Sequence, residues 1–219
     1  MKKNTMMRLA AVMLMCVLLT TSVVGGTFAK YVTSADSTDS ARVAKWGVTV
    51  TVNGDTAFAD EYNATDGNAI AKGVTKSVVE ASGSDDTLVA PGTGGTLVTS
   101  SISGTPEVAV HVECDATLTL TDWVDDASAY YCPLVITIDG TEFSGLSYSS
   151  VGDFIAAVEA KLDADYYVQA NTDLTTGHTV DWSWPFSTSE ANDKKDTDLG
   201  DAGTAKIEFT YEITVTQVD

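Results

Sequence analysis

Histidine and cysteine are scarce in this sequence, which has two histidines and three cysteines among its 219 residues. It contains no HExxH, CxxC or GxSxG spacing, and these patterns indicate zinc hydrolases, thiolate metal sites and serine esterases. His111 occupies a polar position in an alternating stretch, so we expect it on the surface. His178 shares its parity with apolar residues and is expected to be a hydrogen-bonded structural histidine. The sequence therefore predicts no catalytic residue and no enzyme.

Basic residues are also few. Twelve lysines and arginines stand against 31 aspartates and glutamates, and the formal net charge is −19 at pH 7. A surface of this sign repels nucleic acid phosphates and anionic lipid headgroups, so we expect neither as a partner. The acids are spread along the chain rather than gathered in one block, which is typical of a solvated surface that keeps an exported protein soluble.

Long apolar runs are absent except at residues 9–19, LAAVMLMCVLL. Three basic residues and no acid precede this run, and the small-x-small segment TFA follows it. This order is typical of a secretory signal peptide, and the run is shorter than the ~20 apolar residues that span a bilayer. We therefore predict a signal peptide over residues 1–29, cleavage between Ala29 and Lys30, and secretion. An uncleaved N-terminal anchor is the alternative, because residues 20–24 lengthen the apolar run.

Cleavage would leave a mature chain of residues 30–219, whose length suits one domain with a sizeable core. The removed part holds Lys2, Lys3 and Arg8 and no acid, so the net charge would fall to −22. No internal repeat or long linker divides the mature chain. We expect a single extracellular or cell-surface domain without membrane contact after cleavage.

Of the three cysteines, Cys16 lies in the predicted signal peptide, and Cys114 and Cys132 remain. An even pair in an exported chain is typical of a disulfide, and closing this loop would add on the order of 3 kcal/mol. Two buried free thiols are the alternative. Two cysteines alone do not complete a metal site.

Apolar and polar residues alternate with period two through much of the mature region. The pattern is clearest in residues 46–52, 108–120 and 207–215, where one face is apolar and the other carries mostly Thr, Glu and Asp. Strands with one wet face are typical of antiparallel sheets. The Asp139-Gly140 pair between two such stretches predicts a hairpin turn. Further strands are expected near residues 74–80, 96–102, 134–138 and 178–184.

One helix is predicted between the strands. Ser150 can cap its start, Asp153 stands three residues later, and apolar residues then recur at helical spacing. These apolar residues are Val151, Phe154, Ile155, Val158 and Leu162. Many short strands with one inserted helix predict an all-β, mainly antiparallel fold: a β-sandwich, jelly-roll-like, with one inserted helix.

Four aspartates crowd a glycine-containing stretch, NDKKDTDLGDAG. Calcium prefers several oxygen ligands, so Asp193, Asp196, Asp198 and Asp201 are weak candidates for a calcium site. The spacing does not match an EF-hand loop, and two lysines neutralise part of the charge. A solvated polar loop is the favoured alternative, so no metal or cofactor is predicted beyond this calcium candidate.

Three aromatic residues, Trp182, Trp184 and Phe186, alternate with polar residues and Pro185 in DWSWPF. Such a row could stack against a glycan, but aromatics on one face of a strand more often belong to a core. We favour the core. Pro185 cannot donate to a ladder, so the strand should end there or lie on an edge.

Around the predicted cleavage site, a charged start, an apolar run, GGTFA, a small polar segment and the strand VAKWGVTVTV follow one another. In this order the chain resembles the TasA/camelysin family of exported Gram-positive matrix proteins. Residues 88–97, LVAPGTGGTL, lie where that family has a Pro-Gly turn before a strand. The resemblance covers the signal region, and it covers the remainder as architecture.

The resemblance implies processing by a SipW-type signal peptidase and a jelly-roll subunit that polymerises into extracellular biofilm fibres. In such fibres the N-terminal segment freed by cleavage adds as a strand to the next subunit, which is β-augmentation. The matching segment here is residues 30–41, with Lys30, Tyr31 and Val32 at its start. A disordered leader is the alternative, since only Tyr31 and Val32 strongly favour a strand.

Together these observations predict a secreted, non-enzymatic structural subunit that associates with copies of itself. The first alternative is a monomeric secreted surface module that binds a glycan or a protein. The second is a camelysin-like metallopeptidase, for which the sequence offers no recognisable zinc site.

Overall fold

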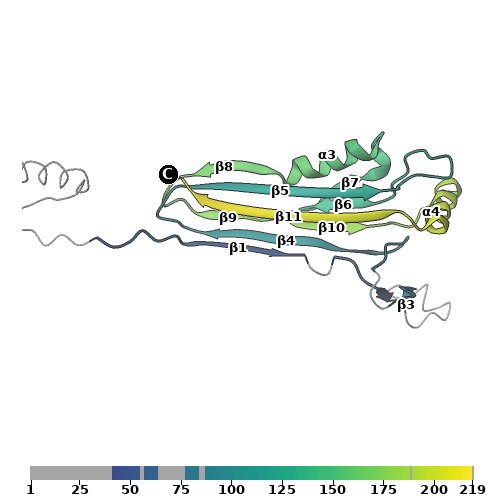
Figure 1. The fold of residues 1–219 in the computed structure, drawn as a ribbon, viewed down its shortest axis with the longest axis horizontal. Helices are drawn as coiled ribbons and strands as arrows, with labels where there is room; N and C mark the ends of the chain where they lie inside the picture. The colour runs from purple at the N-terminus through teal and green to yellow at the C-terminus, as the bar shows by residue number, and fades with distance from the viewer. Residues whose placement is uncertain (1–40, 55–56, 64–76, 84–86, 188, 219) are drawn as a thin grey trace, which may run out of the picture. The chain divides into compact units, whose positions relative to one another are not determined.

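Two antiparallel β-sheets form the body of the protein in a computed structural model that describes residues 41–54, 57–63, 77–83, 87–187 and 189–218 (Figure 1). Three strands make the smaller sheet, in the order β11 (Lys206–Gln217), β5 (Val110–Thr121) and β8 (Ala164–Val168). The larger sheet has the order β1 (Val48–Asn53), β4 (Gly94–Gly104), β10 (Thr179–Ser183), β6 (Val135–Ile138) and β7 (Thr141–Ser144), with β9 (Leu174–Thr176) also paired to β4. A separate ribbon pairs β2 (Glu61–Asn63) with β3 (Ser77–Glu80).

The predicted all-β sandwich is confirmed, because both sheets contribute apolar residues to one core. Every named strand pair is antiparallel. Residues 44–219 form one compact unit. The signal peptide, the Ala29–Lys30 cleavage site and the expected domain start lie outside the described residues. The buried core includes Val98, Ile102, Val110, Val112, Leu118, Leu134, Ile136, Ile138, Val180 and Trp182.

The longest ladder joins β5 to β11, from Val110 opposite Gln217 to Thr121 opposite Lys206. In β5 the predicted alternation is confirmed, since the even-numbered residues from Val110 to Leu118 are buried. In β11 only Tyr211 is buried, and the other apolar residues of the same face are half-buried. The inner face of β11 is therefore less well covered than that of β5.

β1 is an edge strand of the larger sheet, and β4 is its only partner among the strands that the structure describes. The sequence predicted its apolar face, yet that face is not covered: Val50 and Val52 are 38% and 40% exposed. Trp46, just before the strand, is 42% exposed. The smaller sheet has three described strands, and the apolar side of β1 is left largely open.

Two predicted local features are present. The β6–β7 hairpin turns at Asp139-Gly140, whose φ angles of 49° and 81° are both in the left-handed region that type I′ turns require. A short 3-10 turn, η1 (Gly145–Ser147), then leads to helix α3 (Val151–Leu162). Ser150 caps α3 by accepting the backbone N–H of Asp153, at 3.1 Å.

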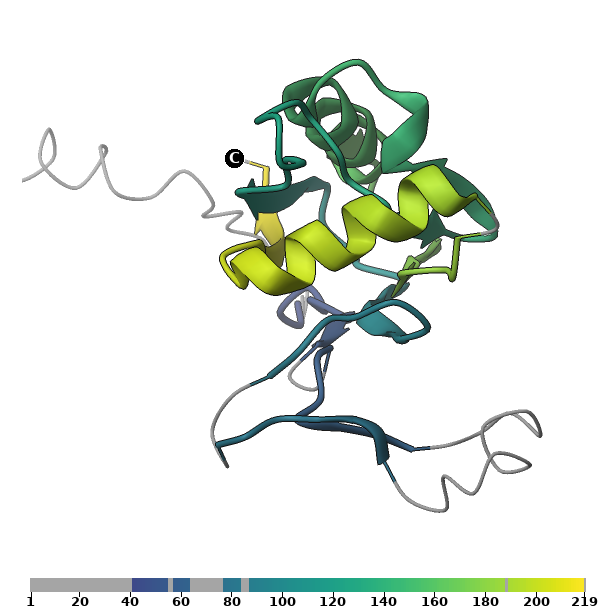
Figure 2. The same cartoon turned by 90° about the vertical axis from the view of Figure 1, so that its right-hand side faces the viewer.

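A second helix, α4 (Glu190–Ala202), lies where the sequence predicted a loop. The predicted inserted helix is present as α3, and α4 is an additional helix that the sequence analysis did not expect. α4 ends at Gly203, whose φ of 62° is a conformation that favours glycine. Figures 1 and 2 show α4 lying across one end of the sandwich. The buried residues of α4 are Asp196 and Leu199. Because one of these two residues is polar, the helix has no apolar periodicity that would have predicted it.

The Ser150 cap gives a test of the α3 boundary. Replacing Ser150 with Ala removes the acceptor of a first-turn N–H and should lower the free energy of unfolding by about 1 kcal/mol. Ser149→Ala is the matched control, because Ser149 Oγ bonds the Asp153 carboxylate at 2.8 Å and no backbone N–H. Urea unfolding followed by tryptophan fluorescence measures both variants, and equal losses would contradict the cap.

Candidate functional site

The outer edge of β11 carries unpaired backbone groups. β11 pairs only with β5 among the described strands. Just after it, the Val218 N–H donates to the Ala109 carbonyl at 3.0 Å, which continues the same register. Residues in an antiparallel ladder alternate between facing the partner and facing away. Even-numbered residues of β11 therefore bond to β5, and the N–H and C=O groups that point outward belong to Ile207, Phe209, Tyr211, Ile213 and Val215.

β1 presents a second free edge. The Glu107 N–H donates to the Lys45 carbonyl at 2.9 Å, in register with the β1–β4 ladder. By the same alternation, the odd-numbered residues of β1 bond to β4, and Val48, Val50 and Val52 face their backbone groups away from it. β1 and β11 approach each other, so the free edges of the two sheets lie on one side of the sandwich.

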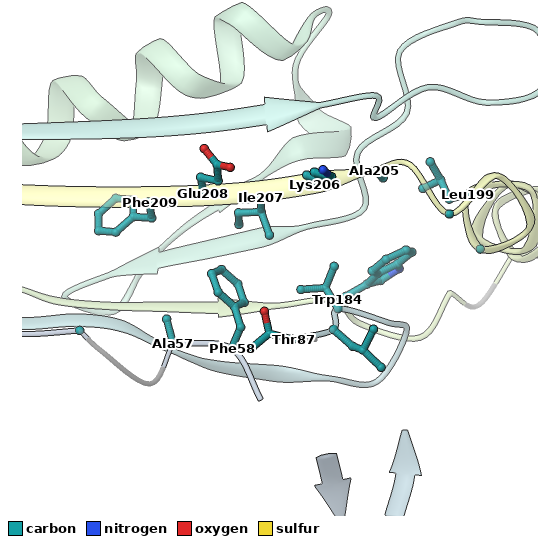
Figure 3. A pocket seen from close by; sticks show the side chains of 15 residues that line it. Ala57, Phe58, Thr87, Trp184, Leu199, Ala205, Lys206, Ile207, Glu208 and Phe209 are labelled. Atoms are coloured by element: carbon teal, nitrogen blue, oxygen red, sulfur yellow. The ribbon is translucent and has the colours of Figure 1, made fainter. Parts of the chain in front are cut away.

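An open groove of about 880 Å³ runs along the first residues of β11 beside α4. Figure 3 shows Phe58 and Ile207 pointing toward each other across it, while Glu208 points away. Trp184 and Leu199 line the end next to α4. The remaining lining residues are Gly54, Ala57, Thr87, Leu88, Val89, Gly200, Gly203, Ala205, Lys206 and Phe209.

The groove is suited to an extended peptide. Among the described residues that line it, only Lys206 and Glu208 have ionisable side chains. Within the part of the chain that the structure describes, no group of three or more His, Cys, Asp and Glu side chains could hold a metal. Half-buried apolar walls beside a row of free main-chain groups allow a strand to pair with β11 and place alternate side chains inward.

A buried carboxylate fixes α4 at the end of this groove. Asp196 is 6% exposed, and its Oδ1 accepts the Tyr131 hydroxyl at 2.8 Å and the Trp184 Nε1–H at 3.3 Å. Burial raises the pKa of Asp196, and the two hydrogen bonds only partly oppose this. Next to it, Lys195 Nζ lies 2.9 Å from the Asp125 carboxylate and 5.1 Å from the Tyr131 ring centre.

The four calcium candidates do not converge. They lie on helix α4 rather than in a loop, and a helix directs neighbouring positions to different sides. Asp196 is buried among aromatic donors, and Asp198 pairs with Lys194 at 2.7 Å. Asp193 and Asp201 are exposed near opposite ends of the helix. The four weak calcium candidates therefore do not form a shared site, and the favoured polar loop is a helix instead.

The cysteines correct another expectation. Cys114 and Cys132 are free thiols, both buried, instead of the predicted disulfide. Cys114 faces inward from β5, opposite Ile213 of β11. Cys132 precedes β6 and packs against Gly145, where an added Cβ would lie 3.0 Å from its Sγ. Each thiol thus has its own packing site. Burial raises the pKa of Cys132 to about 12, so this thiol is inert at neutral pH.

Both histidines pair with aspartates. His111 lies 2.6 Å from Asp165 and stacks on the ring of Tyr167, with 23% of its side chain exposed. His178 Nδ1 lies 2.6 Å from the Asp139 carboxylate at the β6–β7 turn. His178 is thus hydrogen-bonded, as its parity predicted.

The aromatic row is divided between core and surface. Trp182 and Trp184 are 2% and 4% exposed, and Phe186 is 71% exposed. The Phe186 ring covers Gly92, where a Cβ atom would come within 2.4 Å of it. The favoured core assignment therefore holds for the two tryptophans and is wrong for Phe186, and a flat three-ring platform is not formed.

The sequence did not identify the groove. It placed the odd-numbered residues of β11 on an inner face but gave no sign that β11 ends a sheet. Phe58 lies outside any strand, and no periodic pattern marked it. The long, uninterrupted alternation of apolar and polar residues over 207–215 was the one available signal that this strand could pair with a further chain.

Comparison of the chain with protein-family models, with curated proteins and with solved structures found no match. Within the described ranges, no helix is long and apolar enough to cross a membrane. The predicted N-terminal segment, residues 30–41, lies outside the described residues except for Ala41.

Replacing Asp196 tests the buried carboxylate. A raised pKa in the folded state means that ionisation opposes folding, so this group costs stability as pH rises from the unfolded pKa through the folded pKa. Asp196→Asn keeps an oxygen acceptor for both donors and has no charge. Its stability relative to the natural protein should rise with pH across that window and then level off. Urea midpoints from pH 3 to 8 measure the difference, and a pH-independent difference would refute the assignment.

Asp196→Leu is the companion variant. It removes the acceptor of the Trp184 indole N–H, and leaving this buried donor unpaired should cost about 1–3 kcal/mol. The Tyr131 hydroxyl retains the Asn192 carbonyl at 3.1 Å as an acceptor. The same urea titration compares the two variants at pH 7, where Leu should be clearly less stable than Asn.

Proposed function

We propose that the protein is a secreted structural subunit of an extracellular matrix fibre, assembled when the N-terminal segment of one copy adds as a strand to the next copy. The free β11 edge beside an apolar groove is the observation that carries the proposal. Long exposed edges template the pairing of another chain and are normally covered. An edge left open beside half-exposed apolar side chains is suited to strand addition.

The donor in this proposal is residues 30–41 of a second copy. The segment has 12 residues, and β11 also spans 12 residues, so the two match in length as extended chains. Tyr31 and Val32 supply side chains of the kind that favour a strand. The resemblance of the leader region to TasA/camelysin proteins supports the same role. It also supports release of Lys30 by a SipW-type signal peptidase.

Signal removal would tie assembly to export. Before cleavage, residues 30–41 are joined to the apolar leader and have no free N-terminus. After cleavage the segment becomes a chain end that can lie along another molecule. In this proposal the protein is active in the extracellular matrix, and its partners are copies of itself.

The alternative is a secreted binding module that remains monomeric. The same groove favours it, because a strand from an unrelated protein could pair with β11 in the same way. The two functions differ in occupant and in whether the purified protein assembles alone.

Deleting residues 30–41 separates the two functions. The mature chain from Lys30 should form fibres visible by negative-stain electron microscopy, and a chain that begins at Arg42 should remain monomeric by light scattering. Adding the synthetic peptide KYVTSADSTDSA to the shortened chain should fill the groove without restoring fibres. Circular dichroism serves as the folding control. Fibres of the shortened chain would reject the donor segment, and a monomeric mature chain would favour the binding module.

Proline substitutions test the acceptor edge. Ile207→Pro removes an outward N–H that β5 does not use, so the fold should persist while fibre growth falls at least tenfold. Ile207→Ala is the matched control, since it shortens the same side chain and keeps the N–H. Glu208→Pro removes an N–H bonded to β5 and should destabilise the fold itself. Thioflavin fluorescence and urea unfolding measure growth and stability. Equal growth of the Pro and Ala variants would exclude β11 as acceptor.

A further inference from the structure

The smaller sheet has a second edge, on the side of β5 that faces away from β11. Described residues cover this edge, unlike the outer edge of β11. β8 pairs with β5 only from Val110 to Cys114, although β5 continues to Thr121. Beyond Cys114, the even-numbered residues of β5 still point their N–H groups away from β11. Without cover, this stretch would be a second free edge of the smaller sheet.

Two carboxylates of the α3 region occupy this edge. Asp163 Oδ1 accepts the Ala116 N–H at 2.8 Å, and Glu159 Oε1 accepts the Leu118 N–H at 3.0 Å. These are consecutive outward donors of β5, so the two side chains take the positions that carbonyls of a neighbouring strand would take. They also place negative charge on the edge, which is one way proteins prevent further pairing.

α3 holds these carboxylates firmly. Phe154, Val158 and Leu162 are fully or almost fully buried in the core. Glu159 lies in the last turn of α3, and Asp163 is the C-cap residue whose N–H donates to the Glu159 carbonyl at 2.8 Å, so both stand at the end of the helix next to β5. Figure 1 shows α3 lying along the continuation of β8, on the side of β5 away from β11.

We propose that Glu159 and Asp163 block strand addition at the β5 edge, so that the smaller sheet of each subunit accepts an extended strand of a second copy only on its β11 side. The identity of that strand rests on the proposed function. One donor and one acceptor per subunit make a heterologous contact, which extends in one direction without branching. The carboxylates thus determine the direction of assembly while taking no part in the joint itself.

The test compares two double variants of the mature chain. Glu159→Ala with Asp163→Ala removes both acceptors, whereas Glu159→Gln with Asp163→Asn keeps an oxygen at each position. Hydrogen exchange followed by NMR should show the Ala116 and Leu118 amides exchanging at least fivefold faster in the Ala variant. The Gln/Asn variant should remain near the natural rate, and the amides of Val110 and Val112, which β8 covers, should not change in either variant.

Assembly gives the second readout. The natural protein and the Gln/Asn variant should form unbranched fibres, and the Ala variant should form branched or laterally clustered assemblies. With the shortened chain that begins at Arg42, KYVTSADSTDSA should bind at one site per subunit, and at two sites when the Ala substitutions are added. Unchanged exchange at Ala116 and Leu118 would overturn the proposal, as would faster exchange with unbranched fibres and one peptide site.

Failure of the proposed function looks different. In that case the natural protein would form no fibres and bind no peptide, while the exchange difference would persist. The Ala variant should then still gain concentration-dependent self-association in light scattering through its uncovered β5 edge, and a strictly monomeric Ala variant would overturn the blocking role. If the Ala pair fails to fold, Glu159→Ala alone tests Leu118 with Asp163 still in place.

Discussion

Backbone hydrogen bonding at the edges of the smaller sheet is the constraint on which the rest of this structure depends. A three-stranded sheet has two edges, and every amide there must find an acceptor or remain in water. On the β5 side, α3 supplies carboxylate oxygens, and the helix is held by three buried apolar side chains. On the β11 side nothing comparable is present among the described residues. The groove and the half-exposed valines of β1 follow from that asymmetry.

The two described α-helices therefore have distinct roles. α3 completes a sheet that β8 leaves short, and α4 forms one end of the groove. Trp184 connects the groove with α4, since its ring lines the groove while its N–H donates to Asp196 of α4. A polar contact of this kind, buried among aromatic rings, fixes one position of the helix more specifically than Leu199 alone would.

Local signals explain what the sequence could predict. The alternation in β5, the Asp139-Gly140 turn and the Ser150 cap each depend on neighbouring residues, and each is present. Features that depend on distant partners were not predictable in the same way. The alternation in β1 gave a strand but could not show that no second sheet covers Val50 and Val52. α4 was missed because one of its two buried residues is Asp196, and an aspartate is normally expected on the surface. Cysteine count favoured a bridge, whereas bridging depends on where two distant segments pack.

The two unbridged thiols have a consequence for where this protein can fold. Its architecture is held by side-chain packing and main-chain bonding, without a covalent cross-link between the described segments. Oxidation is then not a step on the way to the native state, and a reducing environment is no obstacle to it. Formation of the described sandwich is therefore independent of thiol-oxidising enzymes.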